Sequence, residues 1–415
     1  MNARKLGASG LTFNRIQRFT RQFRHLWKVE GPKGIVKRAR SKLATLLASS
    51  DMPLEVLKQD VLASDISRDR PHAVLSVATD EPIRLNWVVT PAAPGSGGHT
   101  TLYRIINFLE RHGYRSQVYF YDVYSGDHAY YANVVRTYYR FEGPVKNVNN
   151  GMEDAHGVFA TAWQTAYPAM NSQCAGKRFY LVQDYEPYFY PIGSNSVLAE
   201  NTYRMGFYGV TAGRWLAMKL RDEFQMSTEY FSFGCDTQVY KRDSTCKRDG
   251  IAFYSRPGAA RRATELGLLA VEEFARRRPD LKIHLYGEKM GKLSFAFVDH
   301  GAVTPSDLNS IYNRCCAGLS LSMTNVSLVP HEMLAAGCIP VVNEGAQNRI
   351  VLDNEYVRYA SPNPLALASE LEAAVSIPEF DSYSIAAAGS IRSLTWEDAG
   401  RQVDTALRKA LFERD

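Results

Sequence analysis

The sequence predicts an α/β protein built from two Rossmann-like domains, and three observations lead to this prediction. Short apolar runs recur along the chain, each followed by a polar or glycine-containing loop and then by a helical pattern. This strand–loop–helix order occurs in both halves of the chain and is typical of parallel, nucleotide-binding sheets. The length of 415 residues also exceeds what one ordinary hydrophobic core accommodates.

The composition is that of a water-soluble globular protein, with 45% hydrophobic and 22% charged residues. No apolar run reaches the roughly eighteen residues that a membrane-spanning helix needs. After Arg4 and Lys5 the chain stays basic, so a signal-peptide layout is absent and a cytoplasmic location is expected. The six cysteines show neither CxxC spacing nor a paired framework, which favours reduced thiols.

The net charge of +6 conceals an asymmetry between the N-terminal segment and the rest of the chain. Residues 1–50 hold twelve Lys or Arg and one acid, for a charge of +11, so the remainder carries −5. Within this segment Phe13, Ile16, Phe19 and Phe23 recur at helical spacing between arginines. An amphipathic helix is therefore expected, with two possible roles. In the first, residues 1–45 lie on an anionic membrane surface, at the inner face of the plasma membrane. In the second, the apolar stripe packs on the protein itself.

The first domain opens with a glycine-containing loop, residues 91–98, between a predicted strand and a predicted helix. Gly95, Gly97 and Gly98 allow backbone N–H groups to approach a phosphate at the start of the helix. A tight turn after the strand is the structural alternative. Thr100 stands where a dinucleotide fingerprint has glycine, which disfavours an NAD-dependent oxidoreductase. The strands predicted for this domain are 84–90, 116–121, 157–162, 177–183, 208–211 and 230–233, and the helices are 99–112 and 214–223.

The strand at 177–183 leaves into an acidic and aromatic loop that begins with Asp184, Tyr185 and Glu186 and reaches Tyr190. Carboxylates accept hydrogen bonds from sugar hydroxyls, and aromatic rings cover the apolar faces of a sugar. These four residues are therefore predicted to hold a polyhydroxylated ring. The alternative is a loop whose tyrosines simply pack.

The second domain repeats the design, and its first strand, 251–254, leads to arginines on the exit loop. Arg256 on the loop and Arg262 at the start of the next helix can converge on one diphosphate, because guanidinium forks bind phosphate bidentately. Solvated surface charge is the alternative. The other strands predicted here are 282–286, 296–300, 319–322, 339–342 and 356–359, and the helices are 263–277, 306–314, 364–375 and 396–412.

The segment 319–345 reads as strand, loop, short helix and strand. Ser327 or Asn325 is predicted to cap a helix that runs to Ala336, and Gly337 to end it in the left-handed conformation. Glu332 lies inside this helix. A loop and helix start at the carboxyl end of a parallel strand is a usual ligand position, although an ordinary buried unit fits the pattern equally well.

These patterns divide the chain into four parts. Residues 1–80 form a basic helical extension and linker, and 81–245 form an N-terminal Rossmann-like domain. Residues 246–395 form a C-terminal Rossmann-like domain. The helix at 396–415 is expected to cross back to the N-terminal domain.

The motifs HEMLAAGCIPVV (331–342), SRPGAARRA (255–263), PGSGGHT (94–100) and FGCDTQVY (233–240) resemble those of GT-B glycosyltransferases. The chain is similar to the family-4 retaining enzymes, which use nucleoside-diphosphate sugars. The segment VQDYEPYFYPIGS (182–194) most resembles bacterial rhamnosyltransferases of surface and S-layer glycan assembly. The resemblance covers residues 84–412 and implies a GT-B fold with two domains facing across a cleft.

The resemblance also implies roles at the matching positions. Glu332 matches the second glutamate of the family's paired-glutamate motif, which holds the nucleotide ribose, whereas Thr324 replaces the first glutamate, which contacts the donor sugar. Arg256 and Arg262 match the pair that binds the diphosphate. Asp184 lies in the loop that approaches the reacting carbon, so catalysis is assigned to Asp184, Arg256 and Arg262. The resemblance implies that residues 81–245 bind the acceptor and that residues 246–395 bind the nucleotide-sugar donor. The predicted acceptor-binding residues are Asp184, Tyr185, Glu186 and Tyr190. The predicted donor-binding residues are Gly97, Gly98, His99, Arg256, Arg262, Thr324, Asn325, Ser327, Leu328 and Glu332.

The function implied by the resemblance is transfer of a sugar, best matched by L-rhamnose from dTDP-β-L-rhamnose, onto an oligosaccharide or lipid-linked bacterial surface glycan. Because arginines and loop amides can stabilise the departing diphosphate, no metal ion or other cofactor is expected. Nucleic acid is not an expected partner, since no recognition module accompanies the basic segment. The alternative in another class is a catalytically silent GT-B scaffold, supported by the departure at Thr324.

Overall fold

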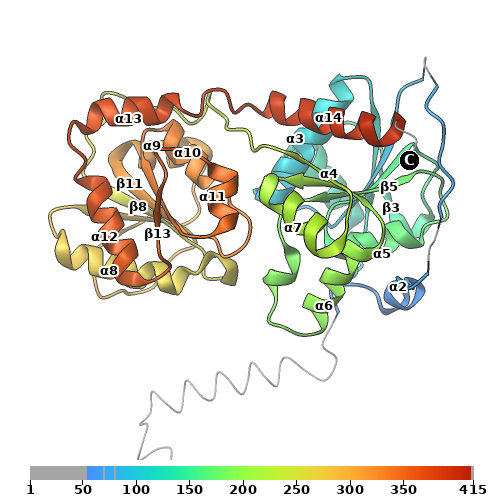
Figure 1. The fold of residues 1–415 in the computed structure, drawn as a ribbon, viewed down its shortest axis with the longest axis horizontal. Coiled ribbons are helices and arrows are strands. Elements are labelled where there is room, and N and C mark those ends of the chain that lie inside the picture. Colours follow the sequence, from blue (N-terminus) through green and yellow to red (C-terminus); the bar gives the residue numbers. More distant parts are fainter. Residues whose placement is uncertain (1–53, 69–70, 79–80, 413–415) are drawn as a thin grey trace, which may run out of the picture. The chain divides into compact units, whose positions relative to one another are not determined.

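The computed structural model of this protein describes residues 54–68, 71–78 and 81–412. The predicted basic helix in residues 1–45 lies outside the described residues. Two parallel sheets, both within the compact unit Glu55–Asp415, carry the chain's helices on their faces, which confirms the predicted α/β class (Figure 1). Because both faces of these strands are covered, the strands are nearly continuous apolar runs.

The first sheet has seven strands in the order β3-β2-β1-β4-β5-β6-β7, all parallel. In its centre, Trp87 of β1 is fully buried and stacks on Phe159 of β4 at 4.0 Å between ring centroids. The strands are β1 (Arg84–Val89), β2 (Arg115–Phe120), β3 (Val145–Asn147), β4 (Gly157–Ala160), β5 (Lys177–Val182), β6 (Tyr208–Ala212) and β7 (Thr228–Phe231).

The second sheet has six parallel strands in the order β10-β9-β8-β11-β12-β13. Its strands are β8 (Gly250–Ser255), β9 (Lys282–Gly287), β10 (Val298–Asp299), β11 (Cys315–Ser320), β12 (Ile339–Asn343) and β13 (Arg358–Ala360). In each sheet the strand order reverses direction beside one central strand, β1 or β8, so the loops after neighbouring strands diverge there. Ligands of open α/β sheets usually bind at such a point.

Helices cover the first sheet, and several match the sequence patterns closely. The observed α3 (Gly97–Arg111) and α7 (Arg214–Phe224) correspond to the two predicted helices. Four further helices were not predicted: α2 (Lys58–Ala63), α4 (His128–Thr137), α5 (Trp163–Asn171) and α6 (Ser194–Asn201). Pro168 lies inside α5 and interrupts its helical pattern in the sequence. Short 3₁₀ turns occur at η1 (Val148–Asn150), η2 (Glu186–Phe189) and η3 (Thr202–Arg204).

In the second half, α8 (Thr264–Arg277) and α12 (Pro364–Val375) pack together on one side of the sheet (Figure 1). The helices α9 (Pro305–Arg314), α10 (Val329–Ala335) and α13 (Phe380–Gly389) lie on the other side. The last helix, α14 (Trp396–Phe412), packs against α3 and β7 of the first sheet. The predicted domain boundaries stay predictions. The remaining elements are η4 (Ala260–Arg262) and α11 (Ala346–Leu352).

Candidate functional site

A pocket of about 780 Å³ opens where the central strands of both sheets end. Its walls come from the loops after β1, β4 and β5 of the first sheet and after β8, β9 and β11 of the second. Eight of the predicted donor-site residues reach it, together with two of the predicted acceptor-site residues. These ten are Gly97, Gly98, His99, Asp184, Glu186, Arg256, Arg262, Ser327, Leu328 and Glu332.

The glycine loop forms one wall of the pocket, and Ser96 starts α3 by capping it. The Ser96 hydroxyl accepts from the His99 backbone N–H at 3.5 Å and lies 2.9 Å from His99 Nδ1. A Cβ at Gly97 would meet no protein atom within 4 Å, so this backbone faces open space. The loop therefore offers N–H groups and room for an anion at the start of a fifteen-residue helix.

The His99 ring is turned towards the backbone. Its Nε2 lies 3.1 Å from the Thr90 carbonyl, which can only accept, so Nε2 carries the proton. Burial lowers the pKa of His99, and the bond to Thr90 opposes this only in part. We therefore expect His99 to be neutral at pH 7 and to fix the loop geometry without adding positive charge to the pocket.

Three arginines line the second wall of the pocket, one more than predicted. Arg262 is half-buried and donates from Nη1 to the Ser322 hydroxyl at 2.7 Å. Arg256 is half exposed, with Nε 3.8 Å from Glu288 Oε1. Arg261 was not predicted as a site residue, because only Arg256 and Arg262 were assigned to the diphosphate. Its Nε lies 3.4 Å from Asp184 Oδ2 and its guanidinium 4.1 Å above the Phe189 ring.

Asp184 is bound mainly by the protein itself. Its Oδ1 accepts from the backbone N–H of Asn325 at 2.8 Å and of Tyr185 at 2.9 Å, while Oδ2 faces Arg261. Burial raises the pKa of Asp184, and the charges of Arg262 and Arg261 oppose the shift. This carboxylate links the loop after β5 to the loop after β11, and its predicted catalytic role stays a prediction.

Glu186 is a second buried carboxyl in the pocket wall. Its Oε2 accepts from the Trp163 backbone N–H at 2.6 Å and from the Tyr180 hydroxyl at 2.5 Å. Burial raises the pKa of Glu186 to about 8, although both of these bonds favour the ionised form. A carboxyl group that is protonated at pH 7 can donate a hydrogen bond to a sugar oxygen as well as accept one.

The prediction that Ser327 or Asn325 caps α10 was wrong. The residue before the helix is Leu328, with no side-chain cap, and Pro330 near the helix start already removes one N–H that would need a partner. The Asn325 side chain donates instead to the carbonyls of Gln183 at 2.9 Å and Ala212 at 2.8 Å. The Ser327 hydroxyl is buried in the pocket wall with no hydrogen-bond partner among the described residues.

Thr324 and Asn325 do not line the pocket, in contrast to their predicted donor-binding role. Both are fully buried. The Thr324 hydroxyl is near enough to Asp184 to lower the pKa of that carboxyl, without forming a hydrogen bond of ordinary geometry. Asn325 connects the loops after β5 and β6 to the segment after β11.

Replacing Asn325 with Ala should lower the free energy of unfolding by roughly 2 kcal/mol, because two buried hydrogen bonds to carbonyl groups are lost together. Urea unfolding of the wild type and the variant measures this change. Asn149→Ala is the matched control, since Asn149 is exposed and its substitution should change stability by no more than about 0.5 kcal/mol. Equal loss in the two variants would contradict the role given to Asn325.

Gly337 ends α10 in the left-handed conformation, as predicted, with φ of 71°. A Cβ there would approach Ser384 Oγ to 2.2 Å, so only glycine fits. Within α10, Glu332 faces the pocket. Burial raises the pKa of Glu332 to about 7, opposed by the charge of Arg104 and a hydrogen bond with Tyr240. Glu332 therefore titrates near neutral pH.

Tyr185 and Tyr190 do not line the pocket, and the structure gives them packing positions. The Tyr185 ring stacks on Tyr203 at 5.7 Å between centroids, and Lys219 Nζ lies 4.4 Å from its centre. The Tyr190 hydroxyl donates to Glu55 Oε2 at 2.5 Å. Two aromatic residues that were not predicted, Tyr254 and Tyr286, line the pocket from the carboxyl ends of β8 and β9. Their rings stack with 5.4 Å between centroids. Their only sequence signal was their position at strand ends.

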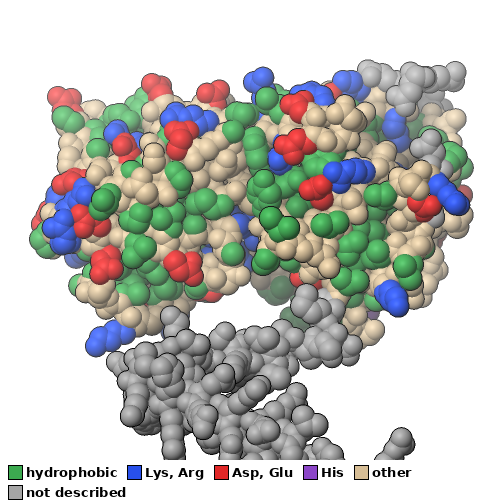
Figure 2. Space-filling view, turned by 60° about the horizontal axis from the view of Figure 1, so that its bottom comes forward, with side chains coloured by type: hydrophobic (Ala, Val, Ile, Leu, Met, Phe, Trp, Pro, Cys, Tyr) green, Lys and Arg blue, Asp and Glu red, His purple; other side chains and the backbone are tan. Residues whose placement is uncertain are grey.

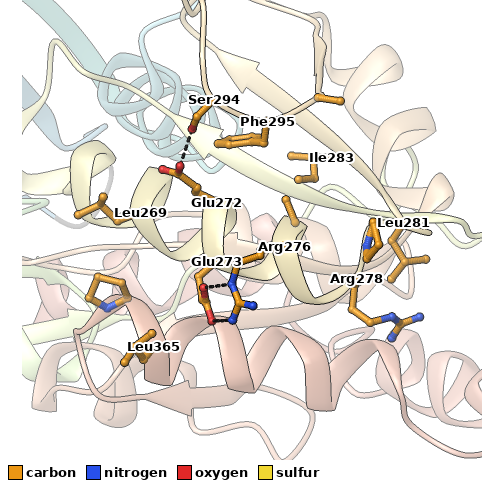
Figure 3. A pocket seen from close by; sticks show the side chains of 14 residues that line it. Leu269, Glu272, Glu273, Arg276, Arg278, Leu281, Ile283, Ser294, Phe295 and Leu365 are labelled. Carbon is orange, nitrogen blue, oxygen red and sulfur yellow. Dashed lines mark hydrogen bonds and ion pairs between the residues drawn. The ribbon is translucent and has the colours of Figure 1, made fainter.

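A second hollow, of about 680 Å³, lies on the surface beside α8 and α12 (Figure 3). Its charged groups are already paired: Glu273 binds Arg276 at 2.7 Å, and Ser294 donates to Glu272 at 2.6 Å. None of the predicted site residues reaches it. The pocket at the strand ends is therefore the better candidate site.

Two absences concern only the described part of the chain. No three His, Cys, Asp or Glu side chains there are arranged to hold a metal ion. No helix there is long and apolar enough to cross a membrane. That the reaction needs no metal stays a prediction.

Comparisons with known proteins agree with this architecture. Residues 106–211 match the family model described as WsaF, N-terminal domain, and residues 249–372 match WsaF, C-terminal domain. The chain is 30% identical over 308 residues to the O-antigen biosynthesis protein RfbC of Myxococcus xanthus. That alignment covers 70% of this chain and 24% of the relative, so the chain spans about a quarter of the relative's length.

Solved structures with the same fold include three with low sequence identity. A glycosyltransferase from Rickettsia africae superposes with a TM-score of 0.57 at 12% identity, over 80% of this chain and all of that one. Anabaena HepE, solved with UDP and glucose, gives 0.59 at 11%, over 79% and 100%. The pneumococcal O-GlcNAc transferase GtfA gives 0.59 at 9%, over 80% and 100%. With its two parallel sheets and its matches to both WsaF domains, the chain belongs to the GT-B glycosyltransferases.

Proposed function

We propose that this protein is a retaining glycosyltransferase that moves L-rhamnose from dTDP-β-L-rhamnose onto a growing bacterial surface glycan. One observation carries the proposal: a glycine loop at a helix start, three arginines and Glu332 line a single pocket. Positive groups on one side and a carboxylate on the other suit a nucleoside-diphosphate sugar. The rhamnose and the retained configuration rest on the resemblance of residues 182–194 and 331–342 to the family.

The relatives support a role in glycan assembly. The curated relative is named as an O-antigen biosynthesis protein, and two of the similar structures contain UDP with glucose or GlcNAc. A lipid-linked acceptor at the inner membrane face is part of the proposal and rests on residues 1–45. The membrane contact is proposed for the N-terminal segment. On the face drawn in Figure 2, Lys and Arg side chains of the described residues are interspersed with Asp and Glu.

During transfer, positive charge develops at the anomeric carbon and negative charge on the departing diphosphate. In the proposed mechanism Arg256, Arg261 and Arg262 stabilise the leaving group, aided by the N–H groups of the glycine loop. Glu332 accepts hydrogen bonds from the ribose hydroxyls when ionised. Because the arginines supply the positive charge, the mechanism uses no metal ion. The diphosphate oxygen accepts the proton of the acceptor hydroxyl.

A thermal-shift panel tests the donor. We expect dTDP-rhamnose to raise the melting temperature more than UDP- or GDP-sugars at equal concentration, because a ligand that binds only the folded state stabilises it more the more tightly it binds. Release of dTDP by the purified protein, alone or with a glycan acceptor, then tests catalysis. Stabilisation by the donor without any release of dTDP would favour the alternative, a catalytically silent GT-B scaffold. The burial of Thr324 away from the pocket also favours this alternative. Equal shifts from all donors would contradict the choice of dTDP-rhamnose.

A further inference from the structure

Helix α4 and its flanking residues present exposed tyrosines beside the candidate site. Tyr124 is 72%, Tyr130 53% and Tyr138 51% exposed, all within fifteen residues of the chain. Large aromatic side chains usually bury most of their surface. Three exposed rings in one short segment therefore indicate a surface that meets another molecule.

The exposed side of α4 combines rings with amide and hydroxyl groups. Tyr130, Asn133 and Thr137 follow the i, i+3, i+7 spacing of one helix face and are exposed, whereas Val135 is buried on the opposite side. Ten residues make this face about 15 Å long. The surface is therefore longer than a single sugar ring.

Neighbouring aromatic rings hold the two helix tyrosines in position. The Tyr130 ring contacts Tyr131 edge to face at 5.8 Å between centroids, and Tyr131 contacts Phe120 of β2 at 5.8 Å. At the other end, Tyr138 contacts Tyr139 edge to face at 4.9 Å. Rings that are already oriented lose little conformational entropy when a ligand binds them.

The C-terminal end of α4 adjoins the candidate donor pocket. The Tyr139 hydroxyl donates to the Ala93 carbonyl at 2.6 Å, which ties the helix end to the glycine loop. The Tyr138 hydroxyl lies 3.8 Å from the position that a Cβ at Gly95 would occupy, and Gly95 lines the pocket. Tyr138, at the C-terminal end of α4, therefore lies at the rim of the pocket.

The chemistry of this face suits a carbohydrate. Aromatic rings cover the C–H faces of sugars, and amide and hydroxyl groups bond to sugar hydroxyls. The basic residue within α4, Arg136, directs its guanidinium to the carbonyls of Phe141 and Gly143 at 2.9 and 3.0 Å. Its guanidinium is thus engaged by the protein backbone.

We propose that the exposed surface of α4 and its C-terminal end, with Tyr130, Asn133, Thr137 and Tyr138 (the tyrosine face), binds an extended stretch of the acceptor glycan, behind the sugar that reacts in the pocket. This proposal rests on the proposed glycosyltransferase function and adds a binding surface to it. It follows that the enzyme distinguishes an oligosaccharide acceptor from a single sugar.

Binding of hexasaccharides to the full chain tests the proposal without turnover. The probes are hexasaccharides of rhamnose, mannose and galactose, each compared with its monosaccharide by titration calorimetry. We expect at least one hexasaccharide to bind and its monosaccharide to bind at least tenfold more weakly. Tyr130→Ala/Tyr138→Ala should weaken hexasaccharide binding roughly tenfold or more. Tyr230→Ala, which removes an exposed tyrosine from β7, is the matched control and should bind as the wild type does.

The donor readout separates this inference from the proposed function. Donor-induced thermal shifts and donor hydrolysis should be the same in the wild type and the double variant, because neither tyrosine lines the donor pocket. Failure of the wild type to bind or hydrolyse any nucleotide sugar would contradict the proposed function only. The tyrosine face is ruled out if no hexasaccharide binds, or if the double variant binds as tightly as the wild type.

Discussion

Replacing Arg262 with Ala should lower the turnover of the nucleotide-sugar donor by roughly 100- to 1000-fold, the usual cost of removing one group that stabilises transition-state charge. Arg262 lines the pocket beside Arg256 and Arg261, and its side chain is partly buried. Water cannot easily replace a guanidinium held in the pocket wall as a partner of the leaving diphosphate. The rate of nucleoside-diphosphate release at saturating donor measures the effect.

The same change removes a structural partner, so folding must be measured alongside activity. Arg262 donates to Ser322, and its charge opposes the raised pKa of Asp184. Ser322 keeps its own bond to the Asn325 carbonyl at 2.6 Å, and Asp184 keeps Arg261, so the fold should survive with a modest loss of stability. Arg262→Lys separates charge from geometry: it should keep the fold and part of the activity, because an ammonium cannot bind bidentately.

Arg276→Ala is the matched control for Arg262→Ala. Arg276 belongs to α8 in the same half of the chain, is exposed, and pairs with Glu273 instead of reaching the pocket. Its removal should leave turnover unchanged. A folded Arg262→Ala protein with wild-type turnover would mean that Arg262 does not act on the diphosphate.

The sequence predicted the sheets better than the helices around them. Parallel strands buried on both faces appear as apolar runs, such as the one at β1, and these are recognisable without an alignment. Helix α5 was missed because Pro168 breaks its pattern, although the Thr165 hydroxyl accepts from the backbone N–H groups of Thr161 and Ala162 and stabilises its start. Hydrogen bonds of this kind depend on the folded backbone, so propensity alone does not reveal them.

The candidate site was predictable where a residue's position in the chain determines its place in the fold. Gly97, Arg256 and Glu332 follow strand ends, and strand ends meet at one edge of a parallel sheet. Arg261 and Asn325 were misread because their partners, Asp184 and Gln183, are distant in the sequence. Tyr185 was misread for the opposite reason: an aromatic residue in a loop can pack inward as readily as it can face a ligand.

Glu332→Gln should make the protein more stable and its donor binding weaker. Burial holds the pKa of Glu332 near 7 in the folded protein, above the ordinary 4.5. The folded state therefore retains a proton that the unfolded state releases, and stability is lost as pH rises from about 4.5 to 7. This loss amounts to at most about 3 kcal/mol above pH 7. The glutamine variant, which cannot ionise, should recover it at pH 8 and match the wild type at pH 4.

Donor binding should change in the opposite direction. If ionised Glu332 accepts the ribose hydroxyls, the donor KM of the wild type falls as pH rises through about 7. The Glu332→Gln variant should show a nearly flat profile and, at pH 8, a donor KM higher by roughly tenfold, which corresponds to about 1.4 kcal/mol. Paired melts and KM measurements at pH 5.5 and 8 test both expectations on the same samples.

Glu344→Gln is the control for a glutamate outside the pocket. Glu344 binds Arg349, which lowers its pKa, so its ionised form favours folding, and replacing it should bring no gain in stability at pH 8. Its donor KM should follow the wild-type pH profile. A Glu332→Gln protein that is more stable at pH 8 but binds donor normally would show that the buried carboxyl is merely tolerated. If Glu332 binds the donor, the Glu332→Gln variant should show both effects together, a higher stability and a weaker affinity for the donor at pH 8.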